Sequence, residues 1–215
     1  MAAKMPDLSL EQDCGGTVAG VDEVGRGPWA GPVVAAAVIL PPDLPDELVD
    51  GLDDSKKLKA ARRETLCALL RGCDGIDIGI GAASTTEIEV HNILAATYIA
   101  MRRALGALDR VPDTALIDGN RLPPDLPCAG RTVIKGDGIS LSIAAASIVA
   151  KVTRDRIMTA LAARYPAYRW ERNSGYGTAQ HRDGLNSAGV TCHHRRTYAP
   201  IAKMLSPGDS DTPHV

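Results

Sequence analysis

Four acidic residues stand at points where apolar segments give way to turns: Asp22, Glu23, Asp118 and Asp137. A sheet can bring such strand-end residues together although they lie far apart in the chain. Carboxylates gathered without cations repel one another and are costly to bury, so their convergence is typical of sites that bind hard divalent cations through oxygen ligands. Two cations held side by side can catalyse phosphoryl transfer. The pattern predicts a two-metal centre.

A structural explanation also exists for each acid taken singly. An Asp at a strand end beside Gly is an ordinary turn former, and for any one of the four that explanation is favoured. It is weaker for Asp22 and Glu23, because apolar residues and glycines surround the pair. Adjacent side chains of a regular strand point to opposite faces. We therefore expect the strand to kink or end near Val24-Gly25, so that Glu23 can join Asp22.

Three other segments could bind a phosphate or a sugar. Gly25-Arg26-Gly27 allows close approach to the backbone and offers a guanidinium suited to phosphate. Ser55 could cap a helix whose first turn, with Lys56, holds a phosphate, although Lys56 could equally be solvated. Tyr176 lies between two glycines and has little side-chain cover, which favours a ring that stacks on a sugar or a base over a core residue.

The C-terminal histidines are interpreted as surface residues. His181 could assist Tyr176, but a lone histidine in a basic loop is more often exposed, and its role stays open. His193 and His194 precede Arg195 and Arg196. No acidic or Cys partner is near them in sequence, so we expect positive surface there and no metal site.

Length and composition indicate one soluble domain. The chain has 215 residues, 45% of them hydrophobic and 23% charged, with a mean hydropathy of -0.06. These values exclude disordered and fibrous classes. No apolar run reaches the roughly 18 residues of a membrane span, and the start has no signal-like apolar core, so we expect a cytoplasmic protein. The five cysteines form no CxxC and suit reduced thiols.

The small net charge of -2 hides an asymmetry along the chain. Residues 1–54 hold two Lys or Arg against eleven Asp or Glu, a balance of -9, whereas residues 151–205 hold ten against three, a balance of +7. Chance placement of surface charge is one explanation. An acidic centre and a basic surface on one molecule is the other.

Hydrophobic periodicity predicts the elements that must position these residues. Strands are expected at 17–22, 33–40, 76–80, 114–117 and 131–135, and helices at 55–70, 84–108 and 139–163. The first two strands form a hairpin, and helical crossovers join the later ones, which indicates an α/β domain with a mixed five-stranded sheet flanked by helices. We expect a flexible segment over 1–16 and a catalytic domain over 17–164. A basic C-terminal helical extension over 165–205 should close over one side of the sheet, and a frayed tail should follow over 206–215.

Five motifs in order resemble bacterial ribonuclease HII, the type 2 ribonuclease H. They are AGVDEVGRGPWAGPVVAAAV, DDSKKL, LIDGN, IKGDGISLSIAAASIVAKVTRD and SGYGT followed by His181, and the likeness spans about residues 17–200. The resemblance implies a ribonuclease H-like fold. It also implies that the metal ligands are Asp22, Glu23, Asp118 and Asp137, and that the junction between RNA and DNA is recognised by Gly25, Arg26, Gly27 and Tyr176. Lys56 is carried over as a phosphate contact.

The activity implied is Mn²⁺- or Mg²⁺-dependent endonucleolytic cleavage of RNA in RNA/DNA hybrids, with incision at ribonucleotides embedded in duplex DNA. The products have 3′-hydroxyl and 5′-phosphate ends. A monomer without a membrane partner is expected, and a clamp or polymerase partner stays open. Two alternatives remain, a nucleic-acid-binding module without catalysis and a different nuclease of the same fold.

Overall fold

A computed structural model describes residues 5–206. Its centre is a five-stranded sheet in the order β3-β2-β1-β4-β5. The strands are β1 (Val18–Val24), β2 (Val33–Ile39), β3 (Asp77–Ala83), β4 (Thr114–Asp118) and β5 (Ala129–Val133). β1 is antiparallel to β2 and parallel to β4, while β5 continues parallel to β4. The mixed sheet with an opening hairpin is confirmed.

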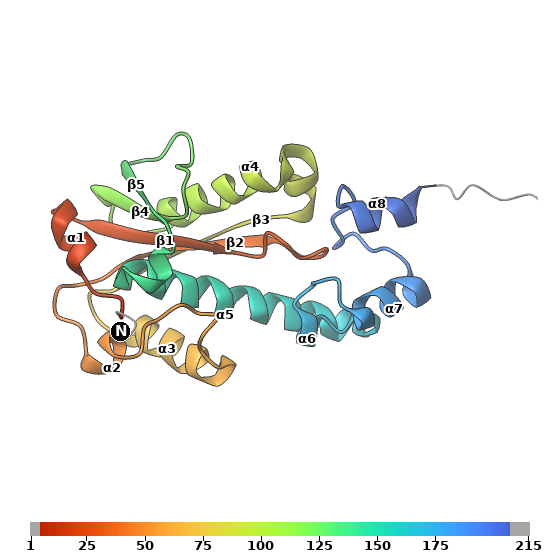
Figure 1. Ribbon diagram of the computed structural model, residues 1–215, viewed down its shortest axis with the longest axis horizontal. Helices are drawn as coiled ribbons and strands as arrows, with labels where there is room; N and C mark the ends of the chain where they lie inside the picture. Colours follow the sequence, from red (N-terminus) through yellow and green to blue (C-terminus); the bar gives the residue numbers. More distant parts are fainter. Residues whose placement is uncertain (1–4, 207–215) are drawn as a thin grey trace, which may run out of the picture.

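Helices cover both faces of this sheet (Figure 1). α4 (Thr85–Gly106) packs on one face, and α5 (Leu141–Arg164) with α3 (Ala60–Gly72) packs on the other. The expected capping box starts α4, since the Ser84 side chain accepts from the Glu87 backbone N–H and the Glu87 side chain accepts from Ser84. With no Phe in the chain, both cores consist mainly of Ala, Val, Ile and Leu. Their small side chains let the helices lie close to the strands.

The remaining elements are short. They are α1 (Ser9–Cys14), α2 (Asp46–Val49), the 3-10 turns η1 (Gly136–Gly138) and η2 (Pro166–Tyr168), α6 (Trp170–Asn173), α7 (Ala179–Ala188) and α8 (Ala199–Leu205). Within residues 5–206, no helix is both long and apolar enough to cross a membrane.

The C-terminal extension lies at the end of the sheet and does not close over a face as expected (Figure 1). It meets the turn between β1 and β2, where the Trp29 N–H donates to Gly175 O and the Gly31 N–H donates to His193 O. A bridge joins Ala30 to His194. Backbone hydrogen bonds therefore fix the extension to the hairpin turn that carries the Gly25-Arg26-Gly27 motif.

Three local expectations differ from the structure. The helix expected from Ser55 begins only at Ala60, and Ser55 instead lies buried in a turn with its hydroxyl 2.9 Å from that of Ser147. β5 spans Ala129–Val133, two residues earlier than expected, and it ends before Lys135, whose left-handed φ of 57° precedes η1. α4 is kinked at Asn92.

The N-terminal segment also differs where it is described. Residues 5–16 contain α1, and its Glu11 carboxylate accepts hydrogen bonds from the Ser140 and Ser142 hydroxyls, both at 2.6 Å. These bonds attach the segment to the start of α5. The frayed tail expected over 206–215 lies, from residue 207 on, outside the described residues.

Candidate active site

Asp22 and Glu23 lie within β1, which stays regular through Val24. The strand ends at Val24, as expected, but it does not kink, and its end does not bring Glu23 to the face of Asp22. Asp22 pairs across the hairpin with Ala36 of the α5-side core, and Glu23 pairs with Ala35 of the α4-side core. The two carboxylates thus point to opposite faces, as strand geometry requires. Asp118, at the end of neighbouring β4, interacts electrostatically with both of them.

Asp22 is the most deeply buried of the four acids, with 5% of its surface exposed. Burial raises its pKa well above the ordinary value, and the charges of Glu23 and Asp118 raise it further. Two hydrogen bonds oppose this rise: one from the Ser147 hydroxyl and one from the Glu23 backbone N–H, at 2.7 Å. Ser147 is the α5 residue that the Ser55 hydroxyl also contacts.

Glu23 is partly shielded by Arg26. Burial raises the pKa of Glu23, the nearby Arg26 guanidinium lowers it, and the Asp118 charge raises it again. The Arg26 Nη1 atom lies 3.4 Å from Glu23 Oε1. The motif arginine and the acid therefore interact directly, which joins the Gly25-Arg26-Gly27 turn to the acidic centre.

Asp118 and Asp137 meet where β4 ends beside η1. The Gly136 N–H donates to Asp118 Oδ1 at 2.7 Å, which places η1 against the strand end. Asp137 is 7% exposed, and its pKa is raised by burial and by the Asp54 and Asp118 charges. Lys56 counters this rise, with its Nζ atom 3.6 Å from Asp137 Oδ2. The fold thus joins all four predicted acids in one electrostatic network.

The donor set suits a hard divalent cation. All four side chains offer carboxylate oxygens, the ligands that Mg²⁺ and Mn²⁺ prefer. Burial, with the charges of neighbouring acids, raises the pKa values of Asp22, Glu23 and Asp137, and bound cations would oppose this rise. As placed, no three His, Cys, Asp or Glu side chains within residues 5–206 converge closely enough to hold one ion. The chemistry therefore fits, while coordination requires side-chain movement.

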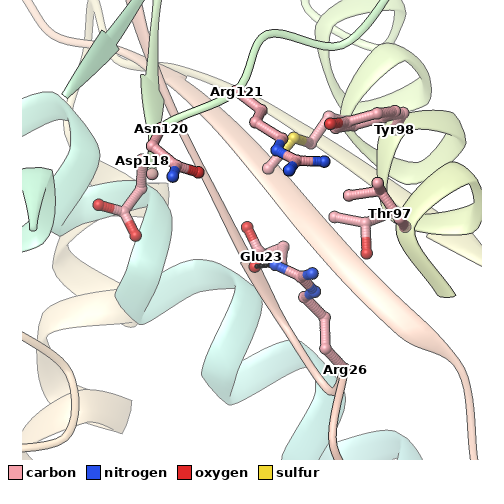
Figure 2. A pocket seen from close by; sticks show the side chains of 10 residues that line it. Glu23, Arg26, Thr97, Tyr98, Asp118, Asn120 and Arg121 are labelled. Carbon is pink, nitrogen blue, oxygen red and sulfur yellow. Dashed lines mark hydrogen bonds and ion pairs between the residues drawn. The ribbon is translucent and has the colours of Figure 1, made fainter. Parts of the chain in front are cut away.

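Two cavities flank β1 next to these acids. One, of about 320 Å³, lies between the end of β4 and α4 (Figure 2). It is lined by Glu23, Arg26, Leu94, Thr97, Tyr98, Met101, Asp118, Gly119, Asn120 and Arg121. The other, of about 270 Å³, is lined by Asp22, Glu23, Val24, Ser55, Lys56, Ser147, Lys151, Arg154 and Tyr176. Each combines carboxylates with cationic side chains, as a phosphodiester substrate near cations requires.

Tyr176 lies beside the Gly25-Arg26-Gly27 turn. Its side chain is half exposed, and a Cβ atom added at Gly27 would stand 3.3 Å from its ring. The expectation that Tyr176 is not a core residue is confirmed. A Cβ at Gly177 would approach the Trp29 ring to 2.1 Å, so that glycine permits packing against Trp29.

The expectation of exposed C-terminal histidines and arginines is wrong for three residues. His181, His194 and Arg195 each have no exposed surface. The Trp170 Nε1–H donates to His181 Nε2, so the proton of neutral His181 resides on Nδ1, from which it donates to the Tyr176 carbonyl at 3.0 Å. His194 Nε2 lies 3.0 Å from His181 Nε2. The histidines thus belong to an aromatic core that supports the Tyr176 segment.

Sequence reasoning missed several residues of this site. Ser147 and Lys151 lie in the N-terminal half of the Ala-rich helix α5 and line the cavity beside Asp22. Arg121, which follows the LIDGN motif, lines the other cavity. In Figure 2, the Arg121 side chain extends into the cavity opposite Glu23. Ser147 could have been singled out in the sequence as a polar residue within an Ala-rich helix. Its position beside Asp22 could not, because that position depends on how α5 crosses β1.

Comparison with known proteins agrees with this geometry. The family model described as Ribonuclease HII matches residues 19–200. A ribonuclease HII from Rhodospirillum rubrum is 59% identical over 203 residues, which cover 94% of this chain and 93% of the relative. The ribonuclease H2 of Pyrococcus horikoshii OT3 has a similar structure, with a TM-score of 0.69 and 26% identity over 87% of this chain and 96% of that chain.

A further similar structure is that of the RNase HII of Archaeoglobus fulgidus in complex with PCNA. It has a TM-score of 0.64 and 25% identity over 85% of this chain and 95% of that chain. Sequence likeness over nearly the whole chain, the mixed five-stranded sheet and the network of acids at the ends of its strands agree with one another. The chain therefore belongs to the ribonuclease HII family of metal-dependent endonucleases that cleave RNA in RNA/DNA hybrids.

Proposed function

We propose that Asp22, Glu23, Asp118 and Asp137 together hold two divalent cations, Mn²⁺ or Mg²⁺, and that this centre incises at ribonucleotides within duplex DNA. The supporting observation is that the fold places the four carboxylates around the ends of β1 and β4 and η1, where burial and then the charges of Glu23 and Asp118 raise the pKa of Asp22. Positive charge would remove the repulsion between these acids. Bound there, the cations supply activation of a water molecule and stabilisation of the leaving 3′-oxygen.

The protein's own groups prepare this centre for its ligands. The Ser147 hydroxyl and the Glu23 N–H donate to the Asp22 carboxylate and favour its ionised form. The Gly136 N–H donates to Asp118 Oδ1 and orients that carboxylate. Arg26 and Lys56 stand on either side, within 4 Å of Glu23 and Asp137 respectively, and can exchange these acids for phosphate oxygens when cations occupy the site.

Recognition of the ribonucleotide is assigned to Gly25, Arg26, Gly27 and Tyr176. The 2′-hydroxyl alone distinguishes a ribonucleotide from its DNA neighbours, and a protein can read it by hydrogen bonding and by packing on the sugar. The half-exposed Tyr176 ring beside Gly27 offers a surface on which the sugar can pack. Arg26, in the same turn as Gly27, forms an ion pair with Glu23 of the acidic centre. Lys56, whose side chain is 80% exposed, is assigned to a neighbouring phosphate.

Cleavage of a labelled duplex with one ribonucleotide, in the presence of Mn²⁺, tests this function. We expect a single cut at the ribonucleotide with a 3′-hydroxyl end, a slower or absent cut in all-DNA duplex, and none in EDTA. Binding without a cut would favour a non-catalytic module. Equal cutting of the all-DNA control would favour a nuclease of different substrate choice.

The proposed function extends to the compartment and the partners of the enzyme. The enzyme is expected to act as a cytoplasmic monomer on nucleic acid. A sliding clamp is the protein partner to test first, because the related Archaeoglobus fulgidus protein was solved with PCNA. Gel filtration with and without the clamp would give a shifted peak if the two associate.

A further inference from the structure

The turn between β1 and β2 is held from the inside by a buried arginine. Arg195 directs its guanidinium at three carbonyls of this turn, donating to Gly25 O, to Arg26 O at 2.8 Å and to Gly31 O at 2.9 Å. The Tyr198 hydroxyl donates to the same Arg26 carbonyl at 2.6 Å, and it accepts from Arg195 at 2.9 Å. Two side chains of the C-terminal extension, Arg195 and Tyr198, therefore set the backbone of the Gly25-Arg26-Gly27 turn.

A second buried arginine connects this turn to the Tyr176 segment. Arg154 of α5 donates to Pro32 O at 2.9 Å, to Ala30 O at 3.0 Å and to Ser174 O at 2.9 Å. Its guanidinium also packs under Gly25, which has a φ of +95° and where a Cβ would meet Arg154 Nε at 2.2 Å. Arg154, together with the backbone hydrogen bond from Trp29 N–H to Gly175 O, thus sets the distance between the turn and the segment that carries Tyr176.

Both buried arginines bind mainly to backbone carbonyls. Arg154 is 1% exposed and Arg195 is fully buried, and neither forms an ion pair with a carboxylate among residues 5–206. Burial and the nearby Arg195 charge lower the pKa of Arg154 to about 10. Burying two guanidiniums with no carboxylate within ion-pair distance is costly. Backbone carbonyls offset that cost, and the result is a turn of defined shape.

The shape leaves two backbone donors unused. In a planar trans peptide the C=O and the following N–H point in opposite directions. Because Arg195 binds the Gly25 and Arg26 carbonyls from the inside, the N–H groups of Arg26 and Gly27 face outward. Neither N–H donates to any group within residues 5–206. Unpaired backbone donors of this kind are uncommon unless water or a ligand satisfies them.

We propose that Arg195, Arg154 and Tyr198 are positioning residues that orient the Arg26 and Gly27 N–H groups and fix their spacing from Tyr176, and that they thereby set selectivity for a ribonucleotide at an RNA–DNA junction. This inference rests on the recognition role proposed above for the turn and Tyr176. None of the three is a metal ligand, so selectivity should change without loss of the acidic centre.

Tyr198→Phe is the mild test, since it removes only the hydroxyl that binds Arg26 O. Tyr168→Phe is its matched control, because the Tyr168 hydroxyl likewise donates to a carbonyl in the extension, Gly189 O at 2.8 Å, away from the turn. The quantity measured is the ratio of kcat/KM on a single-ribonucleotide duplex to kcat/KM on a long RNA/DNA hybrid. We expect Tyr198→Phe to lower this ratio about two- to tenfold, the range of one hydrogen bond, and Tyr168→Phe to leave it unchanged.

Arg195→Lys is the stronger variant, because it keeps the charge but cannot reach three carbonyls at once. We expect a larger fall in the same ratio, carried mainly by KM on the single-ribonucleotide duplex, with Mn²⁺ binding to the metal-free protein as in the wild type. A Tyr198→Phe ratio equal to the wild type, or equal falls in both Phe variants, would overturn the inference. Failure of the wild type to cut either substrate would instead overturn the proposed function.

Discussion

Asp22 and Glu23 are consecutive in β1, yet Asp22 lies on the α5 side of the sheet beside Ser147, whereas Glu23 lies on the α4 side beside Arg26. Asp118, at the end of the next strand, interacts electrostatically with both. The acidic centre therefore lies at the ends of β1 and β4 and opens into a cavity on each side of β1. A substrate strand that crosses these strand ends would meet a carboxylate on either face of the sheet.

Asp22→Asn should reduce the cleavage rate by orders of magnitude. The same substitution should raise the thermal stability of the metal-free protein. The pKa of Asp22 is raised by burial and by two like charges, so a neutral amide relieves repulsion. Cleavage assays at saturating Mn²⁺ and thermal unfolding in EDTA give the two readouts. Asp183→Asn, at an exposed position of α7, is the matched control and should change neither. Near-normal cleavage by Asp22→Asn would remove Asp22 from the proposed site.

Tyr176→Ala should reduce cleavage at a single embedded ribonucleotide more than Tyr176→Phe does. Phe loses only a hydroxyl contact, about 0.5 to 1.5 kcal/mol, whereas Ala also loses the half-exposed ring beside Gly27. Circular dichroism and Mn²⁺ binding should match the wild type in both variants. The measurement is the rate ratio between the single-ribonucleotide duplex and a long hybrid. Wild-type ratios and rates in the Ala variant would identify Tyr176 as a structural loop residue.

Lys56→Gln should weaken substrate binding and reduce the slope of log affinity against log salt concentration by about one, as expected for a lost phosphate contact. Lys57→Gln is the control, because the Lys57 ammonium lies 2.8 Å from Asp53, while Lys56 faces the acidic centre through Asp137. Binding is measured in Ca²⁺ or EDTA to prevent cleavage. Equal slopes for the wild type and the Lys56 variant would show that Lys56 does not contact the backbone. Buried Arg195 is not expected to supply such a contact.

The buried histidines predict a loss of stability in mild acid. Burial, and the repulsion that a protonated His181 would exert, lower the pKa of His194 to about 4, from an ordinary value of 6.5. The unfolded chain therefore binds the proton first, so the stability that neutral His194 contributes is present above pH 6.5 and is lost as pH falls toward 4. His194→Gln should show a smaller difference in thermal midpoint between pH 7 and pH 5 than the wild type. An identical pH dependence in the variant would contradict this account.

The sequence alone was sufficient to predict the fold class, the order of the five strands along the chain, the capping box at Ser84 and all four acids of the electrostatic network. These features depend on local patterns: apolar alternation marks strands, Ser84 and Glu87 form their cap within one turn, and each acid stands near the end of an apolar segment. The prediction failed at Ser55 because a serine before an apolar run resembles a helix cap. A tertiary partner, Ser147, instead binds that hydroxyl in a turn.

Only the tertiary structure decided what lies inside the C-terminal extension. His194 and Arg195 stand in a basic stretch that, by local pattern, is typical of protein surface, and both are fully buried. Their burial depends on carbonyls and rings that lie far away in the chain: the Arg195 acceptors Gly25 and Gly31 precede it by 170 and 164 residues. No local periodicity encodes such a contact, because hydrogen-bond partners at this separation are set by how the extension docks on the hairpin turn.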